Sequence, residues 1–159
     1  MTVEAETEQS ADEGDLAADY LEALLDLADL DGDIEIEVKN GRTYLSVASE
    51  ESDDLEALSK PDVVQALQEL TRLAVQQKTG EFSRLILDIA GSRDRRAAEL
   101  VRLVEAAISR IDDGASSAAL PSMSSYERKL VHDIVAERGY QSESHGEGPD
   151  RHTVITPAE

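Results

Sequence analysis

The segment DIEIEVKNGRTYLSV, residues 33–47, constrains the fold more than any other part of the chain because it contains the pair Asn40-Gly41. Both central residues of a type I′ turn need positive φ, and Asn-Gly adopts that turn most readily. A two-residue turn at this place pairs Val38 with Thr43, Ile36 with Leu45 and Ile34 with Val47. These six residues share one face, and the opposite face carries Glu35, Glu37 and Tyr44. The sequence therefore predicts an antiparallel hairpin whose register agrees with its apolar pattern.

Apolar periodicity predicts four helices, over about 15–30, 61–79, 92–111 and 125–138. Pro61 takes the first position of the second helix and Gly80 follows its end. Ser124 and Glu127 have the spacing of a capping box for the last helix. The second helix is expected to bury Val63, Leu67, Leu70 and Ala74, and the third Ala97, Val101, Val104, Ile108 and Ile111. Further strands are predicted over 82–90, 140–144 and 152–156.

The resulting order, α-β-β-α-β-α followed by α-β-β, predicts an α+β protein of two small domains. The acidic segment 1–14 lacks apolar periodicity, so we expect a disordered tail there. The segment that begins at Asp112 has the composition of a linker. The predicted domains are therefore 15–111 and 120–159, with the linker over 112–119.

The charge of the chain is unevenly distributed. The formal net charge is -20, and residues 1–56 hold 19 of the 35 acids with only Lys39 and Arg42 as bases. The remaining 103 residues are nearly neutral, at -3, and can still present local basic patches. There is no Cys, which excludes a thiol nucleophile and a Cys-ligated metal site. No apolar run reaches the length of a membrane span and no leader segment is apparent, so a cytoplasmic location without membrane insertion is expected.

The candidate binding residues lie near the C-terminus. Arg128 and His132 are one helical turn apart, within roughly 40° of each other around the helix, at the edge of its apolar face. The following loop offers the Ser144 hydroxyl, a glycine-rich backbone at Gly146 and Gly148, and the guanidinium of Arg151. These groups suit a phosphodiester backbone better than a catalytic triad, because no activated nucleophile is apparent. No catalytic residue or cofactor is therefore expected. No metal site is expected either, because the three histidines lack supporting spacing.

The segment LPSMSSYERKLVHDIVAERGYQSESHGEGPDRHTVI, residues 120–155, resembles the R-three-H domain, which is named for its Arg-x-x-x-His pair. Arg128 and His132 match that pair, and the element Ser-x-Gly-x-Gly-x-x-Arg is matched by Ser144, Gly146, Gly148 and Arg151. The resemblance implies binding of single-stranded nucleic acid without chemistry.

The segment LILDIAGSRDRRAAELVRLVEAA, residues 85–107, resembles the last strand and helix of the type II KH domain in Jag-type proteins, also called EloR. Those proteins join a KH domain directly to an R-three-H domain. The resemblance therefore implies that 15–111 is a type II KH-like α-β-β-α-β unit whose final long helix leads into the α-β-β R-three-H domain over 120–159.

Two departures from that family stand out. The KH family grips the nucleic-acid backbone with a Gly-x-x-Gly loop, and residues 58–61 stand there as Leu-Ser-Lys-Pro. Only Lys60 remains to meet a phosphate, and acidic residues 50–54 lie just upstream. Many relatives also carry an additional N-terminal domain with a basic linker, for which this chain has only the acidic tail.

Further basic residues are candidates for secondary nucleic-acid contacts: Lys60, Arg93, Arg95, Arg96, Lys129 and His145. The three arginines crowd the first turn of a helix, where the helix dipole disfavours cations. Two interpretations are open. The arginines bind a phosphate or an acidic patch of a partner, or they pair with Glu35 and Glu37 of the acidic hairpin.

The sequence thus predicts a non-enzymatic regulator that binds single-stranded RNA, or single-stranded DNA, mainly through the R-three-H domain. The alternative is a protein-interaction adaptor whose KH-like half binds a second small KH protein or a membrane-insertase-associated partner. An enzyme, such as a phosphoesterase with His132 as general acid, ranks last. The RNA targets and the oligomeric state are not encoded in any recognisable pattern.

Overall fold

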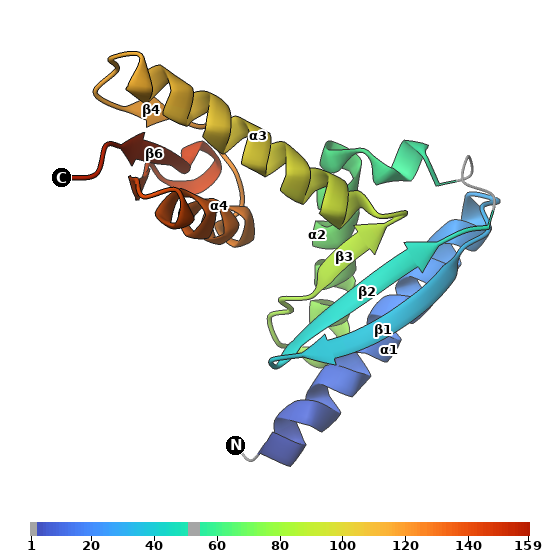
Figure 1. Ribbon diagram of the computed structural model, residues 1–159. Coiled ribbons are helices and arrows are strands. Elements are labelled where there is room, and N and C mark those ends of the chain that lie inside the picture. Colours follow the sequence, from blue (N-terminus) through green and yellow to red (C-terminus); the bar gives the residue numbers. More distant parts are fainter. Residues whose placement is uncertain (1–2, 51–54) are drawn as a thin grey trace. The chain divides into compact units, whose positions relative to one another are not determined.

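The computed structural model describes residues 3–50 and 55–159, with side chains described over 12–50 and 55–159. The chain forms two compact units, Met1–Asp94 and Arg95–Glu159 (Figure 1). The first contains α1 (Val3–Leu27), β1 (Asp33–Lys39), β2 (Arg42–Ala48), the 3-10 turn η1 (Ala57–Ser59), α2 (Pro61–Thr79) and β3 (Ile86–Ile89). Helix α3 (Ser92–Asp112) begins at its end. The second unit continues with β4 (Ala118–Ala119), α4 (Ser125–Glu137), β5 (Gln141–His145), the 3-10 turn η2 (Gly148–Asp150) and β6 (His152–Thr156). The predicted α+β class is confirmed.

The predicted hairpin is confirmed together with its register. Asn40 and Gly41 have φ angles of 53° and 72°, as a type I′ turn requires. Strands β1 and β2 are antiparallel and pair Val38 with Thr43, Ile36 with Leu45 and Ile34 with Val47. Strand β3 lies parallel to β2, which gives the sheet order β1-β2-β3.

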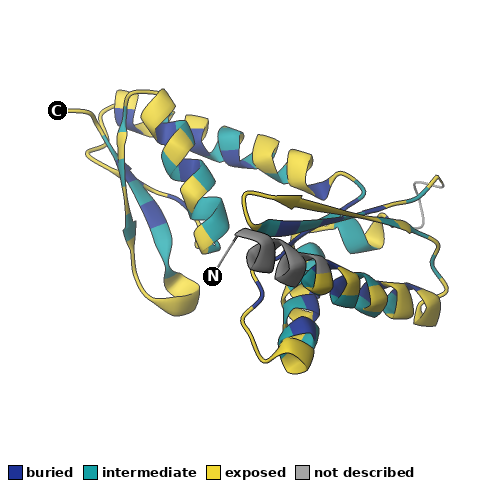
Figure 2. Ribbon diagram, turned by 90° about the horizontal axis from the view of Figure 1, so that it is seen from below, coloured by how far each residue is buried: buried dark blue, intermediate teal, exposed yellow. Residues whose placement is uncertain are grey.

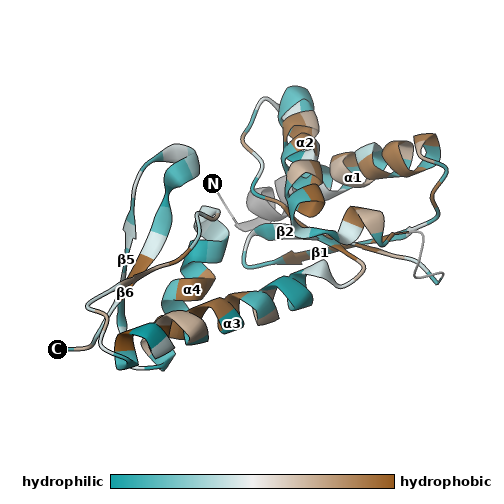
Figure 3. Ribbon diagram, turned by 90° about the horizontal axis from the view of Figure 1, so that it is seen from above, coloured by the Kyte–Doolittle hydropathy of each residue, from teal (hydrophilic) through white to brown (hydrophobic). Residues whose placement is uncertain are grey.

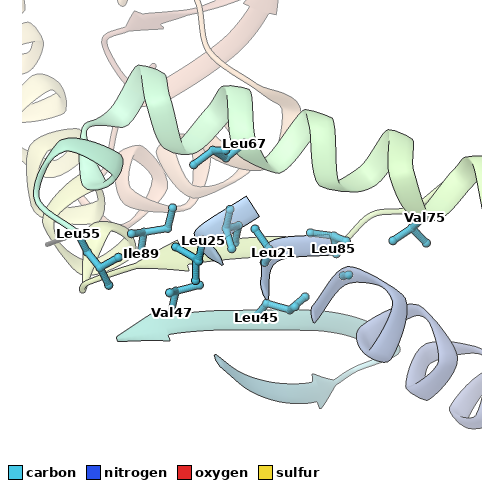
Figure 4. Close-up of a cluster of buried hydrophobic side chains, with 11 residues drawn as sticks. Leu21, Leu25, Leu45, Val47, Leu55, Leu67, Val75, Leu85 and Ile89 are labelled. Carbon is cyan, nitrogen blue, oxygen red and sulfur yellow. The ribbon is translucent and has the colours of Figure 1, made fainter. Parts of the chain in front are cut away.

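Helices α1 and α2 cover one face of this sheet and enclose an aliphatic core (Figure 4). Its largest fully buried side chains come from β2, β3 and their flanking loops: Leu45, Leu55, Leu85, Leu87 and Ile89. The prediction that Leu70 faces the core is wrong, because α2 buries Leu67, Thr71 and Val75 and leaves Leu70 48% exposed. Thr71 tolerates burial because its hydroxyl donates to the Leu67 carbonyl at 2.6 Å.

We expected residues 1–14 to form a disordered tail, but α1 already begins at Val3. Residues 1–2 lie outside the described part of the chain. Ala and Glu residues favour a helix in this stretch even without an apolar face. The Glu13 carboxylate accepts hydrogen bonds from the hydroxyls of Thr43, at 3.4 Å, and of Ser83. Gly14 is buried so closely against β1 that an added Cβ would lie 2.7 Å from the Ile36 side chain. The end of the predicted tail is therefore part of the folded unit.

A second core lies between α3, α4 and the sheet β4-β6-β5. Figure 2 shows buried residues along α3 and in β6, and Figure 3 shows the matching apolar side of α3. The buried members are Leu100, Val104, Ala107, Ile111, Ala118, Leu120, Val131, Val135 and Ile155. The predicted α3 seam is correct at Val104 and Ile111, but Ala97 is exposed. Leu100 takes its place because a leucine buries more apolar surface than an alanine.

The boundary between the units also differs from the predicted one. We expected α3 to close the first domain, but the chain divides between Asp94 and Arg95, and the apolar stripe of α3 packs against α4 and β6. The predicted linker over 112–119 includes β4, whose Ala118 and Ala119 pair with Ile155 and Val154 of β6. A strand of only two alanines has no alternation of polar and apolar residues by which it could be recognised from sequence.

Replacing Glu13 by Ala should lower the free energy of unfolding by about 1–3 kcal/mol, because two buried hydroxyls lose their acceptor. Thr43 and Ser83 are only 1% and 5% exposed, so water cannot replace the carboxylate freely. Urea unfolding followed by circular dichroism measures the effect. Asp15→Ala is the matched control, because it removes the same charge from an exposed position two residues away. Equal destabilisation by the two variants would contradict the assigned role of Glu13.

Candidate nucleic-acid interface

The first turn of α4 is held by two sets of hydrogen bonds. The side chain of Ser124 accepts from the Glu127 backbone N–H at 3.2 Å, as the predicted capping box requires. The Glu127 carboxylate accepts two hydrogen bonds from Arg96 of α3, Nε to Oε1 at 2.8 Å and Nη2 to Oε2 at 3.2 Å. These bonds, reinforced by one to Glu99 at 2.9 Å, raise the pKa of Arg96. The bidentate pair therefore fixes the start of α4, one residue before Arg128.

His132 bridges α4 to the edge strand β5. Its Nδ1 lies 2.6 Å from the Ser142 hydroxyl and its Nε2 lies 3.0 Å from the Ser144 hydroxyl. Partial burial, followed by the charge of Arg128, lowers the pKa of His132, and Asp133 offsets only part of this. The imidazole therefore favours its neutral form, in which one nitrogen donates and the other accepts. The neutral ring therefore bridges α4 and β5 through hydrogen bonds and orients the Ser144 hydroxyl.

Arg128 lies one turn before His132 and faces the connection between β4 and α4. Its Nη1 donates to the Met123 carbonyl at 3.1 Å. Its Nε is buried without a hydrogen-bond acceptor among the described residues. The guanidinium is thus fixed by a single hydrogen bond and retains donors for a further acceptor.

The loop between β5 and β6 is a compact turn closed by Arg151. The Arg151 Nη1 donates to the Gly146 carbonyl at 2.9 Å, and the N–H groups of Asp150 and Arg151 bond within the loop. Gly146 has a φ of 84°, and an added Cβ would lie 2.8 Å from the Asp150 carbonyl oxygen. A glycine is therefore required at 146, whereas a Cβ on Gly148 would point into open space. The loop depends on close backbone approach at only one of its two glycines.

Met123 connects the two arginines of the candidate site. Its carbonyl accepts from the Arg128 side chain, and its N–H donates to the Arg151 carbonyl at 3.3 Å. On the adjacent strands, Ser144 is the register partner of Thr153, two residues beyond Arg151. The hydrogen bonds and strand pairing thus bring Arg128, His132, Ser144 and Arg151 to one part of the second unit.

Most of the secondary candidates are placed elsewhere. Lys129 pairs with Asp133 at 3.0 Å on the exposed side of α4, and His145 lies 3.6 Å from Glu143. Arg96 forms ion pairs with Glu127 and Glu99 within the second unit. Arg95, the first residue of that unit, is exposed. Lys60 caps the N-terminus of α2 without a side-chain hydrogen bond to that helix, and Arg93 lies over the Tyr44 ring. The contact of Arg96 with Glu127 leaves this guanidinium poorly suited to a ligand phosphate.

The sequence reasoning missed Ser142, which has the shortest contact to His132. Strand alternation contained the signal, because Ser142 and Ser144 are two residues apart and so face the same side of β5. Met123 was missed as a connecting residue because its role rests on backbone groups, which no residue type reveals.

The electrostatic surroundings favour an anionic ligand. Over the described residues, neither Arg128 nor Arg151 forms an ion pair with a carboxylate. Within the same part of the chain, no group of three or more His, Asp or Glu side chains is placed to hold a metal ion. None of the helices searched there is long and apolar enough to cross a membrane.

Comparison with known proteins agrees with this geometry. A family model described as the R-three-H domain matches residues 98–157. Residues 98–157 are thus similar to the R-three-H domain, which agrees with the resemblance of residues 120–155. The matched range begins inside α3, so the match includes most of the helix that the sequence analysis assigned to the preceding domain.

Three relatives are each named RNA-binding protein KhpB. The protein from Clostridium symbiosum is 28% identical over 145 residues, which is 89% of this chain and 65% of the relative. The protein from Lactiplantibacillus plantarum is 30% identical over 95 residues, 60% of this chain and 29% of the relative. The Bacillus subtilis protein is 32% identical over 94 residues, 57% of this chain and 45% of the relative. The chain thus spans less than two thirds of the length of each, and none of their names indicates an enzyme.

Replacing Arg128 by Gln should raise the pKa of His132 toward its usual value of 6.5, because the nearest repelling charge is removed. A titration of the His132 ring protons by NMR measures this shift. In the unchanged protein the folded state binds the His132 proton more weakly than the unfolded chain does. The second unit should therefore lose stability as the pH falls through 6.5 toward the lower folded pKa.

Arg102→Gln on α3 is the control, since it removes an equal charge from an exposed position. A His132 pKa that stays unchanged in Arg128→Gln would contradict the electrostatic coupling.

Proposed function

We propose that this protein binds single-stranded RNA through the R-three-H domain and is not an enzyme. Arg128 and Arg151 would contact backbone phosphates, and Ser144, oriented by His132, would donate to a phosphate or sugar oxygen. Gly146 and Gly148 would let the strand approach the loop. The observation that carries the proposal is the pair of arginines joined through Met123, neither of which has a carboxylate partner within the described part of the chain. The names of the three KhpB relatives support RNA as the ligand.

Binding of this kind is dominated by phosphate charge and is weakly sequence-specific. The neutral form of His132 adds a hydrogen-bonding network but no charge, so the two guanidinium groups supply the electrostatic attraction. Single-stranded DNA would bind by the same groups, and the sugar hydroxyls of RNA offer Ser144 an additional partner. The site of action would be the cytoplasm.

We further propose that the first unit is a type II KH-like domain whose usual grip on nucleic acid is weakened. Its order α1-β1-β2-η1-α2-β3, with β3 parallel to β2, agrees with the resemblance of residues 85–107. Residues 58–61 span the end of η1, Lys60 and the first residue of α2, and Pro61 there has no N–H to offer a phosphate.

Side chains of α2 also occupy the open edge of β3. Gln68 accepts from the Leu87 N–H at 3.1 Å, and the Nε of Arg72 donates to the Leu85 carbonyl at 2.9 Å. Backbone groups along this edge are therefore already bonded within the protein. A further strand or a base could form hydrogen bonds with this edge only by displacing the side chains of Gln68 and Arg72.

The alternative function is a protein-interaction adaptor, with a small KH protein or a membrane-insertase-associated protein as the partner of the first unit. One observation favours it. Leu73 on α2 is 60% exposed and Phe82, just beyond that helix, is 87% exposed. Large apolar side chains at these exposures are typical of a contact surface. Under this alternative, Phe82→Ser with Leu73→Ser would abolish partner binding after nuclease treatment and leave RNA affinity unchanged.

A phosphoesterase with His132 as general acid is disfavoured. A general acid must carry a proton to donate, and the lowered pKa of His132 leaves the ring neutral near pH 7. The Ser144–His132 contact resembles a nucleophile and base, but Ser142 rather than a carboxylate occupies the other ring nitrogen.

Replacing both Arg128 and Arg151 by Ala should weaken binding of an oligouridylate and lower the slope of log K against log salt by roughly 1.4, at about 0.7 for each single-strand phosphate contact. Fluorescence anisotropy over a series of salt concentrations measures both quantities. The matched control is Arg102→Ala with Arg110→Ala, which removes two exposed arginines from the same unit. Thermal unfolding of all variants establishes that the fold is retained. An unchanged slope and affinity in the Arg128, Arg151 variant would refute the assigned site.

A further inference from the structure

Cations gather at one end of an otherwise acidic unit. Residues 1–94 contain 24 Asp and Glu but only seven Lys and Arg, a net charge of -17. Three of the seven bases, Lys39, Arg42 and Arg84, line a single hollow of about 260 Å³ at the hairpin turn. The other lining residues are Asn40, Gly41 and Tyr44. Such a concentration of positive charge is unexpected where acids outnumber bases more than threefold.

The strand register explains how these residues meet. Lys39 and Arg42 are partners across the β1-β2 turn. Tyr44 of β2 is opposite Ile86 of β3 in a parallel pair, and Arg42 and Arg84 each precede that pair by two residues. The hollow therefore combines the ends of β1 and β2 and their turn with the segment that leads into β3.

Two more arginines lie close to it. The Arg93 guanidinium lies 4.6 Å from the centroid of the Tyr44 ring, as in a cation–π pair. Burial lowers the pKa of Arg72, the neighbouring charges of Arg42 and Arg84 lower it further, and Glu69 and Glu13 offset part of this. Five of the seven cations of the unit thus lie around the hairpin turn, and only Lys60 and Lys78 lie outside this group.

This arrangement is repulsive within the protein itself. Over the described residues, Lys39 and Arg84 form no ion pair. Lys39 and Arg84 therefore repel each other, and an anion bound between them would lower this repulsion. The turn is also accessible, because no atom lies within 4 Å of a Cβ built on Gly41.

We propose that this hollow is a second phosphate-binding site for single-stranded RNA, separate from the R-three-H site and from residues 58–61. The inference rests on the proposed function, because it assigns the hollow the same class of ligand as the R-three-H arginines. Lys39, Arg42 and Arg84 contact phosphate oxygens, and the Tyr44–Arg93 pair packs against a base or sugar. The length of β2 separates this end of the sheet from η1, which packs beside the far end of β3 (Figure 1).

The composition of the hollow favours RNA over an acidic peptide. Guanidinium groups bind phosphates in a bidentate manner, and a tyrosine ring with a stacked arginine is a surface on which bases pack regardless of sequence. A peptide carboxylate would use the cations but not the Tyr44–Arg93 pair.

The test uses the full chain labelled with ¹⁵N and a 20-nucleotide oligouridylate as probe. Each site has its own reporter, because Gly41 lies in the hollow and Gly146 in the R-three-H loop. Shifts of both amides support the inference. A shift of Gly146 alone overturns the second site and leaves the proposed function intact. A shift of Gly41 alone refutes the R-three-H assignment and supports the hollow, and shifts of neither refute both.

Two charge reversals complete the experiment. Arg84→Glu should weaken oligouridylate binding three- to tenfold and lower the salt slope by about 0.7, the value for one phosphate contact. Lys78→Glu makes the same charge change at an exposed position outside the cluster and should leave the slope unchanged. Equal effects of the two variants would overturn the site in favour of general charge. A decaglutamate peptide that shifts Gly41 as strongly as the RNA would overturn the assignment of the ligand class.

Discussion

The candidate RNA site depends on one imidazole. His132 spans two serines of β5, and this bridge joins the helix that carries Arg128 to the strand that leads into the glycine loop. β5 is an edge strand of a three-stranded sheet, so its position depends heavily on the helix packed against it. Without the bridge, Ser144 and the loop that Arg151 closes would lose their fixed relation to α4. The histidine of the Arg-x-x-x-His pair thus acts here as a structural partner of the arginine and not as a second charge.

The two units differ in how their cations are arranged for binding a polyanion within an acidic protein. The second unit is nearly neutral and pairs several of its cations internally, as with Arg96, Lys129 and Arg138. What remains for a ligand is a small number of arginines with fixed backbone contacts. The first unit has a large negative charge and concentrates its few cations in one place. In both, local arrangement rather than net charge determines where an anion can approach, because screening limits the reach of distant acids to about 10 Å at moderate salt.

Short-range rules predicted the elements well where a single physical constraint dominates. The Asn40-Gly41 turn fixed the register of six residues, and the Ser124 cap fixed the start of α4. The predictions were weaker where tertiary packing chooses among faces of one helix. Thr71 replaced Leu70 in the core because a hydroxyl that bonds its own helix is not costly to bury. Glu13 illustrates the same limit, since its acceptor role depends on residues 30 and 70 positions away.

The candidate site was predictable in composition but not in role. Arg128, His132, Ser144 and Arg151 are brought to one part of the fold, yet only coordinates reveal that His132 binds two hydroxyls and that Arg151 closes its own loop. A motif specifies which side chains meet. Their charge states and hydrogen-bond partners follow from burial and neighbours, which residue spacing does not encode.

Residues 58–61 and the open turn at Gly41 differ in how closely a phosphate can approach the backbone. A phosphate approaches a backbone only where no side chain intervenes, so Leu58 and Pro61 restrict access at the first position. Gly41 has a positive φ and open space above its Cα, and basic residues surround it on both strands. A sheet end with these properties meets steric and electrostatic conditions for phosphate binding that residues 58–61 do not meet. Because the turn is fixed by its type I′ geometry, it presents those cations without the entropy cost of ordering a flexible loop.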